Sequence, residues 1–300
     1  MNAVAAASNG TLGAAVFFGS RSSGVATNSA SAYDLMLVCD RPGLFYRAMH
    51  DAGFLQRSPR LLSFLDPLLP PTQVRLAQDT WLVKASVLST SSLCRATSAD
   101  RKDQFVAGRL FQDVHVVWAR DAGFSETMEG AIESARRVTL DWVAPDLPDR
   151  FDAPWYLRQL FRTSFRFEVR PETRGRADAL YEAQAARLVP IFAEVLPALQ
   201  AEGRLVAGSD GTFSLRHPVS RTHALGRRLF LEWSRVRATA RWPKHAVTFD
   251  GWLDYIRRKA ERHSGEAIVL TPMERRFPLI LLWPRVFRFL GRQRRKGRPV

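Results

Sequence analysis

Two short apolar runs, joined by a loop of small residues, decide the fold of this chain. The first run and the residues after it read AAVFFGSR at residues 14–21, and the second reads YDLMLV at residues 33–38. Both runs are short and bounded by small or turn-forming residues, so they are predicted to form adjacent buried strands over residues 13–18 and 34–39. The first strand ends at Gly-Ser, and a carboxylate opens the second.

The junction between these two strands carries the chemistry. Gly19 lets the backbone approach a triphosphate closely, and the Ser20 hydroxyl and the loop amides offer hydrogen bonds to phosphate oxygens. Asp34, at the start of a buried strand, would hold a Mg²⁺ ion on those phosphates. Nucleotidyltransferases need this layout. The same residues are also compatible with a Gly-Ser turn between two core strands, in which Asp34 is only a turn residue.

Charge is the most lopsided feature of the composition. The 300 residues include 44 Lys and Arg against 29 Asp and Glu, a formal net charge of +15, and 46% of the residues are hydrophobic. This length and apolar content predict one large or two medium domains with a substantial core. The excess of basic residues implies an anionic partner, which can be nucleic acid, an acidic membrane or a phosphorylated substrate.

Several classes of protein find no support in the sequence. Cys39 and Cys94 have no CxxC spacing and no neighbouring histidine, so they are expected to be reduced, buried thiols of a cytosolic protein. The six histidines show no metal-ligand spacing, and His115 is expected in the core. Residues 1–18 lack the early basic residue of a signal peptide, and no run of 18 uncharged apolar residues is present to span a membrane.

The rest of the chain alternates between predicted helices and strands until the pattern changes near residue 176. We expect helices over residues 43–54, 105–110, 126–143 and 155–161, strands over 81–88 and 114–118, loop and turn over 59–71, and a strand or a helix end over 164–170. Beyond residue 176 we expect a long helix over 177–202, a hairpin over 205–215 around Asp210-Gly211, and helices over 222–240 and 248–262.

These elements predict an α/β (α+β) fold in three parts. Residues 1–176 would form a nucleotidyltransferase-like domain with a mixed sheet and helices, and residues 177–265 a mostly helical, winged-helix-like domain. Residues 266–300 would form a basic, amphipathic C-terminal segment for membrane contact.

The predicted metal site lacks one residue of the usual pattern. Most polymerase-β-like nucleotidyltransferases place two acidic residues two positions apart at this strand start. Here Asp34 fills the second position and Ala32 the first. The site is therefore either inactive or typical of a subfamily that builds its metal site differently.

Further along, the chain resembles one family, the mitochondrial-type phosphatidate cytidylyltransferases. These are peripheral CDP-diacylglycerol synthases related to the mitochondrial translocator assembly and maintenance protein. The resemblance rests on the Gly-Ser element with its single acid, on WLVKASV at residues 81–87 followed by Ser92-Leu93-Cys94, on AGRL at residues 107–110, and on SFRFEVR at residues 164–170. These segments occur in the family's order over residues 14–170, about half of the chain, as in a distant bacterial relative. The family usually has Gly then Asp where this chain has Phe167 and Glu168.

The resemblance implies a role for each matched polar residue. Gly19, Ser20 and Arg21 would bind the CTP phosphates, and Asp34 and Glu168 would share Mg²⁺. Lys84 and Arg170 would neutralise the triphosphate or the lipid phosphate, and Arg109 is a further nucleotide-binding candidate. Asp34, Glu168 and Lys84 would thus be the catalytic set.

Each of these charged candidates also has a structural alternative. Lys84 can be a solvated strand-end lysine, Arg109 a surface or strut arginine, and Glu168 the partner of its neighbours Arg166 and Arg170. If Glu168 lies far from Asp34, the next candidate ligands are Asp113 and Asp141.

The C-terminal segment differs in character from the rest of the chain. FPLILLWPRVFRFL at residues 277–290 precedes the basic run RQRRKGR at residues 292–298. The apolar part is too short to span a bilayer, and it suits an interfacial position in which the basic run meets anionic headgroups. Packing on the protein's own core and a nucleic-acid arm are the alternatives, and the resemblance favours the membrane over nucleic acid.

The resulting prediction is a peripheral enzyme of phospholipid biosynthesis on the cytoplasmic, inner face of a membrane. It would transfer a cytidylyl group from CTP to phosphatidic acid with Mg²⁺, giving CDP-diacylglycerol and pyrophosphate. One alternative is a nucleotidyltransferase that acts on another acceptor, namely a protein, a small molecule or RNA. The other is a catalytically inactive membrane-binding protein with the same fold, which the missing acid at Ala32 favours.

Overall fold

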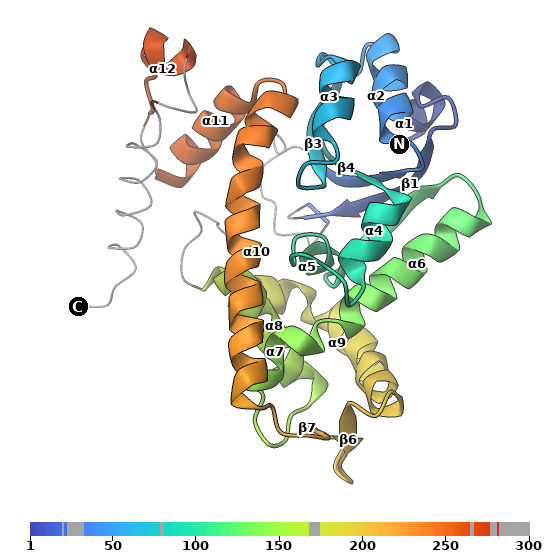
Figure 1. Ribbon diagram of the computed structural model, residues 1–300, viewed down its shortest axis with the longest axis vertical. Coiled ribbons are helices and arrows are strands. Elements are labelled where there is room, and N and C mark those ends of the chain that lie inside the picture. The colour runs from blue at the N-terminus through green and yellow to red at the C-terminus, as the bar shows by residue number, and fades with distance from the viewer. Residues whose placement is uncertain are drawn as a thin grey trace.

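A five-stranded mixed sheet lies in the N-terminal half of the computed structural model, which describes residues 1–19, 21–22, 33–78, 81–167, 175–264, 267–276 and 281. The strand order is β3-β4-β2-β1-β5 (Figure 1). Their bounds are β1 Leu12–Phe18, β2 Tyr33–Cys39, β3 Thr72–Gln78, β4 Trp81–Ser89 and β5 His115–Ala119. β1 is antiparallel to β2 and β5, whereas β2 and β4 are parallel. The predicted strand pair β1–β2 and the mixed α/β class are therefore confirmed.

Helices cover both faces of this sheet, because both faces of its central strands are apolar. On β2, Leu35, Leu37 and Cys39 join one buried cluster, and Met36 and Val38 join the other. Helices α1 (Asn2–Ala7), α2 (Pro42–Asp51) and α3 (Pro59–Leu65) cover the first face. Helices α4 (Thr90–Thr97), α5 (Ala107–Leu110) and α6 (Ala122–Arg137) cover the second.

The C-terminal half is mostly helical, as predicted. Its elements are α7 (Leu140–Val143), the 3-10 turn η1 (Ala144–Asp146), α8 (Ala153–Arg166), α9 (Arg176–Ala201), the hairpin strands β6 (Leu205–Ala207) and β7 (Phe213–Leu215), and helices α10 (Arg221–Thr248), α11 (Trp252–Ser264) and α12 (Pro272–Arg276). The hairpin is confirmed, and Gly211 in its turn has a φ of 77°. The winged-helix-like character and the domain boundaries stay predictions.

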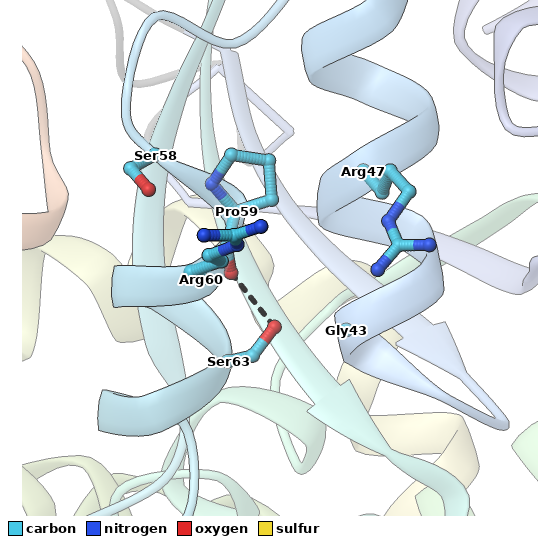
Figure 2. Close-up of a pocket in the computed structure, with 6 residues that line it drawn as sticks. All are labelled: Gly43, Arg47, Ser58, Pro59, Arg60 and Ser63. Carbon is cyan, nitrogen blue, oxygen red and sulfur yellow. Dashed lines mark hydrogen bonds between the residues drawn. The ribbon is translucent and has the colours of Figure 1, made fainter.

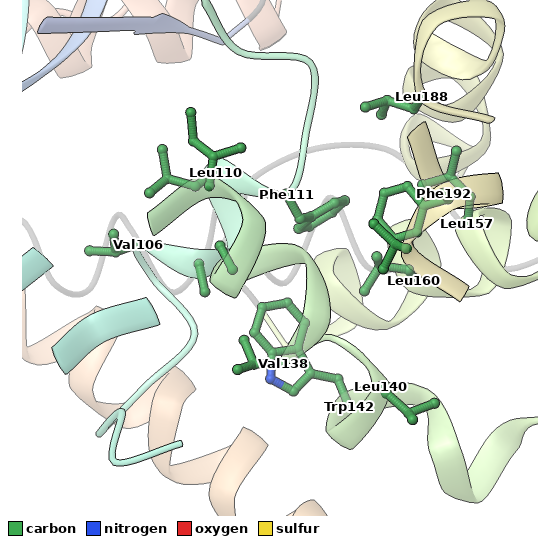
Figure 3. Close-up of a cluster of buried hydrophobic side chains, with 14 of the residues drawn as sticks. Val106, Leu110, Phe111, Val138, Leu140, Trp142, Leu157, Leu160, Leu188 and Phe192 are labelled. Carbon is green, nitrogen blue, oxygen red and sulfur yellow. The ribbon is translucent and has the colours of Figure 1, made fainter. Parts of the chain in front are cut away.

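The larger hydrophobic core joins the two halves. It extends from Ala14 and Val16 of β1 through α8 and α9 to Leu231 of α10. Figure 3 shows side chains of α5 to α9 converging around Phe111. The Phe111 ring lies edge-on to Phe161, with 5.4 Å between centroids. Burial of this shared apolar surface holds the sheet and the helical half together.

The structure corrects several local predictions. Residues 59–65 form α3 where only loop was expected, because Pro59 occupies the first helical turn, where a proline is tolerated. Strand β3 was not anticipated. The predicted helix over 126–143 is divided into α6 and α7, and α10 continues through Pro243 to Thr248. His115 is exposed, since β5 is an edge strand, and Cys94 is exposed on α4, while Cys39 is buried as expected.

Candidate functional site

Three charged residues form a row across the sheet, toward the end where β2 begins. β1 ends where β2 and β5 begin, because Phe18 pairs with Asp34 and Phe17 pairs with His115. The parallel register then places Lys84 of β4 directly beside Asp34, and β3 brings Arg75 beside Lys84. Directly paired residues project from the same face of a sheet. Asp34, Lys84 and Arg75 therefore form one row on the face that carries Met36 and Val38.

Gly19 is fitted to Asp34 in two ways. Its φ of 89° lies in the left-handed region that favours glycine. A Cβ atom on Gly19 would also lie 2.7 Å from Oδ2 of Asp34, closer than a real side chain allows. The turn after β1 therefore touches the carboxylate, and no larger residue fits without displacing it. The phosphate-binding role of this turn stays a prediction.

Asp34 and Lys84 form a partly exposed ion pair. Nζ of Lys84 lies 3.7 Å from Oδ1 of Asp34, and about a quarter of each side chain is exposed (25% and 27%). The pair is thus accessible to solvent, as a ligand-binding pair must be. A carboxylate next to an ammonium group on a neighbouring strand offers one ligand for a cation and one charge for a phosphate.

Arg21 lies at the end of the sheet where Asp34 begins its strand, but it packs on Tyr33, whose side chain projects from the opposite face to Asp34 and Lys84. Its guanidinium stacks over the ring of Tyr33, 4.3 Å from the centroid. Ser22, the next residue, donates a hydrogen bond to the carbonyl of Asp113 at 3.2 Å. Both contacts fasten the described part of the loop to the edge of the sheet where Asp34 begins its strand.

The corner between α10 and α11 closes over the same row. The ring centroid of Tyr255 on α11 lies 6.0 Å from Nζ of Lys84. Asp250, in the corner, lies 3.7 Å from Arg57 and 4.0 Å from Arg75. Gly251 has a φ of 66°, and a Cβ there would lie 2.8 Å from Nη1 of Arg75. The corner is therefore fitted to Arg75, the in-register neighbour of Lys84.

Sequence reasoning did not single out His245, which lies on α10 next to these groups. Burial first, and then the charges of Lys84, Lys244 and Arg241, lower the pKa of His245 from 6.5 to about 3. The ring donates a hydrogen bond to the Pro71 carbonyl, while Nε2 is buried and lacks a hydrogen-bond partner among the described residues. The imidazole is therefore neutral, with one buried acceptor nitrogen. A lone histidine in a basic stretch carries no sequence signal for this position.

Neighbouring cations on α10 are held by backbone carbonyls and one buried carboxylate. Nζ of Lys244 donates to the Leu68 carbonyl at 2.5 Å, and burial lowers the pKa of Lys244 to about 8. Arg241 contacts Asp103 at 2.6 Å. Although burial opposes the shift, Arg241 and Arg237 hold the pKa of Asp103 below its usual value. These contacts fix the rotation of α10 against the sheet.

The remaining site predictions have different outcomes. Ser20, Glu168 and Arg170 lie outside the described residues, so their roles stay predictions. Arg109 donates to the carbonyl of Phe105 at 2.6 Å, and its guanidinium lies 3.6 Å from the centroid of the Phe105 ring, as a strut arginine would. The role of Arg109 in nucleotide binding stays a prediction.

Of the two reserve carboxylates, only Asp113 lies near the site. It precedes β5 at the edge of the sheet and lies 2.6 Å from Nε of Arg187. Asp141 instead bridges Arg101, at 2.7 Å, and Arg204. Within the described part of the chain, no group of three or more His, Cys, Asp or Glu side chains is arranged to hold a metal ion.

One surface hollow lies on the helices that cover the opposite face of the sheet from Asp34 and Lys84. Figure 2 shows it between α2 and α3, lined by Gly43, Arg47, Ser58, Pro59, Arg60 and Ser63. Its volume is about 820 Å³. Helices α2 and α3 cover the face of the sheet that carries Leu35 and Leu37, whereas Asp34 and Lys84 project from the other face. The hollow is therefore separate from the candidate site.

Comparison with known proteins adds no family assignment. No protein-family model and no curated protein matches the chain. Among the described helices, none combines the length and the apolar character needed to cross a bilayer. The functional argument therefore rests on the geometry around Gly19, Asp34 and Lys84, and on the resemblance in the sequence.

Proposed function

We propose that this protein is a nucleotidyltransferase that transfers a cytidylyl group from CTP to phosphatidic acid at a membrane surface. One observation carries the proposal: a left-handed glycine turn touches a partly exposed carboxylate that is paired with a lysine on the parallel neighbouring strand. Gly19, Asp34 and Lys84 thus lie together, where they would respectively bind phosphate, bind a cation and neutralise phosphate charge. The choice of CTP and phosphatidic acid comes from the family resemblance.

The residues present fit a magnesium ion held jointly by protein and substrate. Mg²⁺ commonly takes one or two carboxylates, with the remaining positions filled by water and substrate phosphates. Asp34 supplies one such carboxylate, and Glu168 is the predicted second ligand. When bound, the ion would polarise the phosphoryl group and offset its developing charge.

The protein's own residues would orient the reactants. The Gly19 turn would seat the triphosphate, and Lys84 and Arg21 would neutralise its charge. The phosphate oxygen of phosphatidic acid would then form a bond to the α-phosphorus of CTP in line with the leaving group. The bond between that phosphorus and the bridging oxygen to the β-phosphate would break, and pyrophosphate would leave with that oxygen. The reaction needs no protein nucleophile.

A second candidate is nucleotide binding without transfer. It is favoured by Ala32, which replaces the first acid of the general pattern. In that case the Asp34–Lys84 pair would serve binding alone. An acceptor other than phosphatidic acid would leave the geometry of the pair unchanged.

Incubation with each of the four nucleoside triphosphates distinguishes these functions. Purified protein would receive Mg²⁺ and liposomes that contain phosphatidic acid, and pyrophosphate and CDP-diacylglycerol would be measured. We expect both products with CTP, and neither after chelation of Mg²⁺ or with Asp34→Asn. Nucleotide binding without either product supports the binding-only alternative, and pyrophosphate without CDP-diacylglycerol indicates another acceptor.

A further inference from the structure

Helix α10 presents an apolar stripe to solvent. Leu225, Leu229, Trp233 and Val236 are 58%, 61%, 56% and 53% exposed. Their spacings of four, four and three residues place all four side chains on one side of the helix. We call these four residues the outer stripe. At a rise of 1.5 Å per residue, the stripe is about 16 Å long.

The outer stripe cannot turn inward, because the opposite side of α10 is anchored. Ser234 accepts a hydrogen bond from the backbone nitrogen of Gln104 at 3.0 Å, and Arg237 and Arg241 both contact Asp103. Leu231 is completely buried in the larger core. In Figure 1, α10 runs along the molecule from the β6–β7 hairpin to α11. Exposed apolar residues that gather on one face of an anchored helix mark an interaction surface.

A row of arginines borders the outer stripe. Arg221, Arg228 and Arg235 are exposed, and their spacing of seven residues places them along one edge of the helix. Glu232 lies at this edge as well, but its carboxylate is 2.8 Å from Arg235 and is thus offset by that charge. An apolar stripe with leucine and tryptophan beside a basic edge is the pattern of a helix that lies on an anionic lipid surface.

We propose that the outer stripe and its arginine edge dock the protein on an anionic lipid bilayer, with α10 lying along the surface. The inference deepens the proposed function and rests on its lipid acceptor. Charge favours the bilayer over a second copy of the chain, because two copies with a net charge of +15 repel each other. Lys244 and His245 lie on the buried side of the same helix, so docking through the stripe leaves the residues around Lys84 uncovered.

Liposome co-sedimentation with matched variants tests the docking surface. The stripe variant is Leu225→Gln, Leu229→Gln and Trp233→Gln, and its control is Phe64→Gln with Leu68→Gln, which removes exposed apolar groups (74% and 55%) elsewhere. The edge variant is Arg221→Glu with Arg228→Glu, and its control is Arg47→Glu with Arg60→Glu at the hollow between α2 and α3. Circular dichroism would verify that each variant is folded.

We expect the stripe variant to bind phosphatidic acid-containing liposomes about tenfold more weakly or worse, since binding follows the buried apolar area and the attraction to anionic lipid. The edge variant should lose most of the salt-sensitive part of binding, and both controls should bind as the unmodified protein does. Unchanged binding by the stripe variant would overturn the proposal. A second result would also overturn it. If light scattering shows that the unmodified protein is a dimer and the stripe variant a monomer, the stripe is a contact between two copies of the chain.

Docking and catalysis can fail separately in this design. If the stripe matters for liposome binding but no nucleoside triphosphate yields pyrophosphate, the docking surface stands and the transferase assignment is wrong. If the protein acts on a water-soluble, short-chain phosphatidic acid but does not bind liposomes, the docking surface is wrong and the transferase assignment stands.

Discussion

At the scale of single residues, Gly19 offers the sharpest test of the site. Gly19→Ala would force a side chain into a left-handed turn and against Oδ2 of Asp34, so both stability and nucleotide binding should fall. Gly53→Ala is a matched control, since Gly53 has a φ of 77° but open space around the added methyl group. Both variants should lose about 1 kcal/mol of unfolding free energy to backbone strain. Only Gly19→Ala should also weaken nucleotide binding, as measured by calorimetry.

Asp34→Asn separates the chemistry of the carboxylate from its structural role. The amide keeps the shape of the side chain but loses the charge that a cation needs, so pyrophosphate release should fall about a hundredfold or more. The unfolding free energy should change by less than about 1 kcal/mol, because the pair with Lys84 is partly exposed. Asp146→Asn is the control, as Asp146 also pairs with a basic side chain, Arg227, and is 40% exposed. Near-normal turnover in Asp34→Asn would refute the metal-site hypothesis.

Much of this site could be predicted from local sequence, and the rest depended on long-range pairing. The apolar run before Gly19 and the run that begins at Asp34 are consecutive in the sequence, so their pairing as adjacent strands could be predicted. The position of Lys84 beside Asp34 follows from a parallel register, which a crossover of two helices and a strand determines. His245 reaches the site only because α10 folds back over the sheet, so nothing near it in the sequence marked it.

At the scale of elements, the anchoring of α10 should make stability depend on pH through His245. The unfolded chain takes up a proton near pH 6.5, whereas burial and the charges of Lys84, Lys244 and Arg241 hold the folded pKa near 3. The neutral ring therefore contributes stability that is fully present above pH 6.5 and is lost as the pH falls toward 3. Each unit in that window should cost up to about 1.4 kcal/mol.

His245→Asn tests this pH dependence. Asparagine retains a donor for the Pro71 carbonyl but does not titrate, so urea unfolding between pH 4.5 and 6.5 should show a flatter profile for the variant. His217→Asn, at an exposed position, should leave the slope unchanged. Equal slopes for His245→Asn and the unmodified protein would contradict the buried, neutral ring. Because the pKa of Asp103 is lowered, this residue changes the unfolding free energy only below about pH 4. It therefore does not affect the slope measured between pH 4.5 and 6.5.

The sequence analysis missed elements in which apolar and polar residues alternate over only a few positions, and elements that contain a proline. β3 reads TQVRLAQ, in which Thr72, Val74 and Leu76 are buried and Gln73 and Arg75 are not. This period of two is the signature of a half-buried strand, but it covers only two apolar positions. The expected helices over 222–240 and 248–262 left out residues 241–247, which continue α10 because Arg241 and Lys244 bind carbonyls of the loop before β3.

At the scale of the whole molecule, the shared core predicts that the two halves unfold together. The larger core runs from β1 to α10, and Asp103 depends on two arginines of α10 for its charge balance. A chain that ends at residue 176 would expose the apolar surface that packs on Leu188 and Phe192, and it would leave Asp103 buried without its partners. The predicted boundary near residue 176 thus divides a sheet-containing half from a helical half, but we expect the two halves to fold as one unit.

Unfolding measurements on the full chain and on residues 1–176 test this expectation. Far-ultraviolet circular dichroism and tryptophan fluorescence should report one coincident urea transition for the full chain, as a single cooperative unit requires. The fragment should lack a cooperative transition and bind a hydrophobic dye, because its share of the core has lost its other side. Two resolved transitions, or a fragment that unfolds cooperatively, would show instead that the sheet and its helices are stable without α9 and α10. In that case the contacts of Asp250 and Tyr255, in and after the corner between α10 and α11, with Arg75 and Lys84 would serve the site rather than the fold.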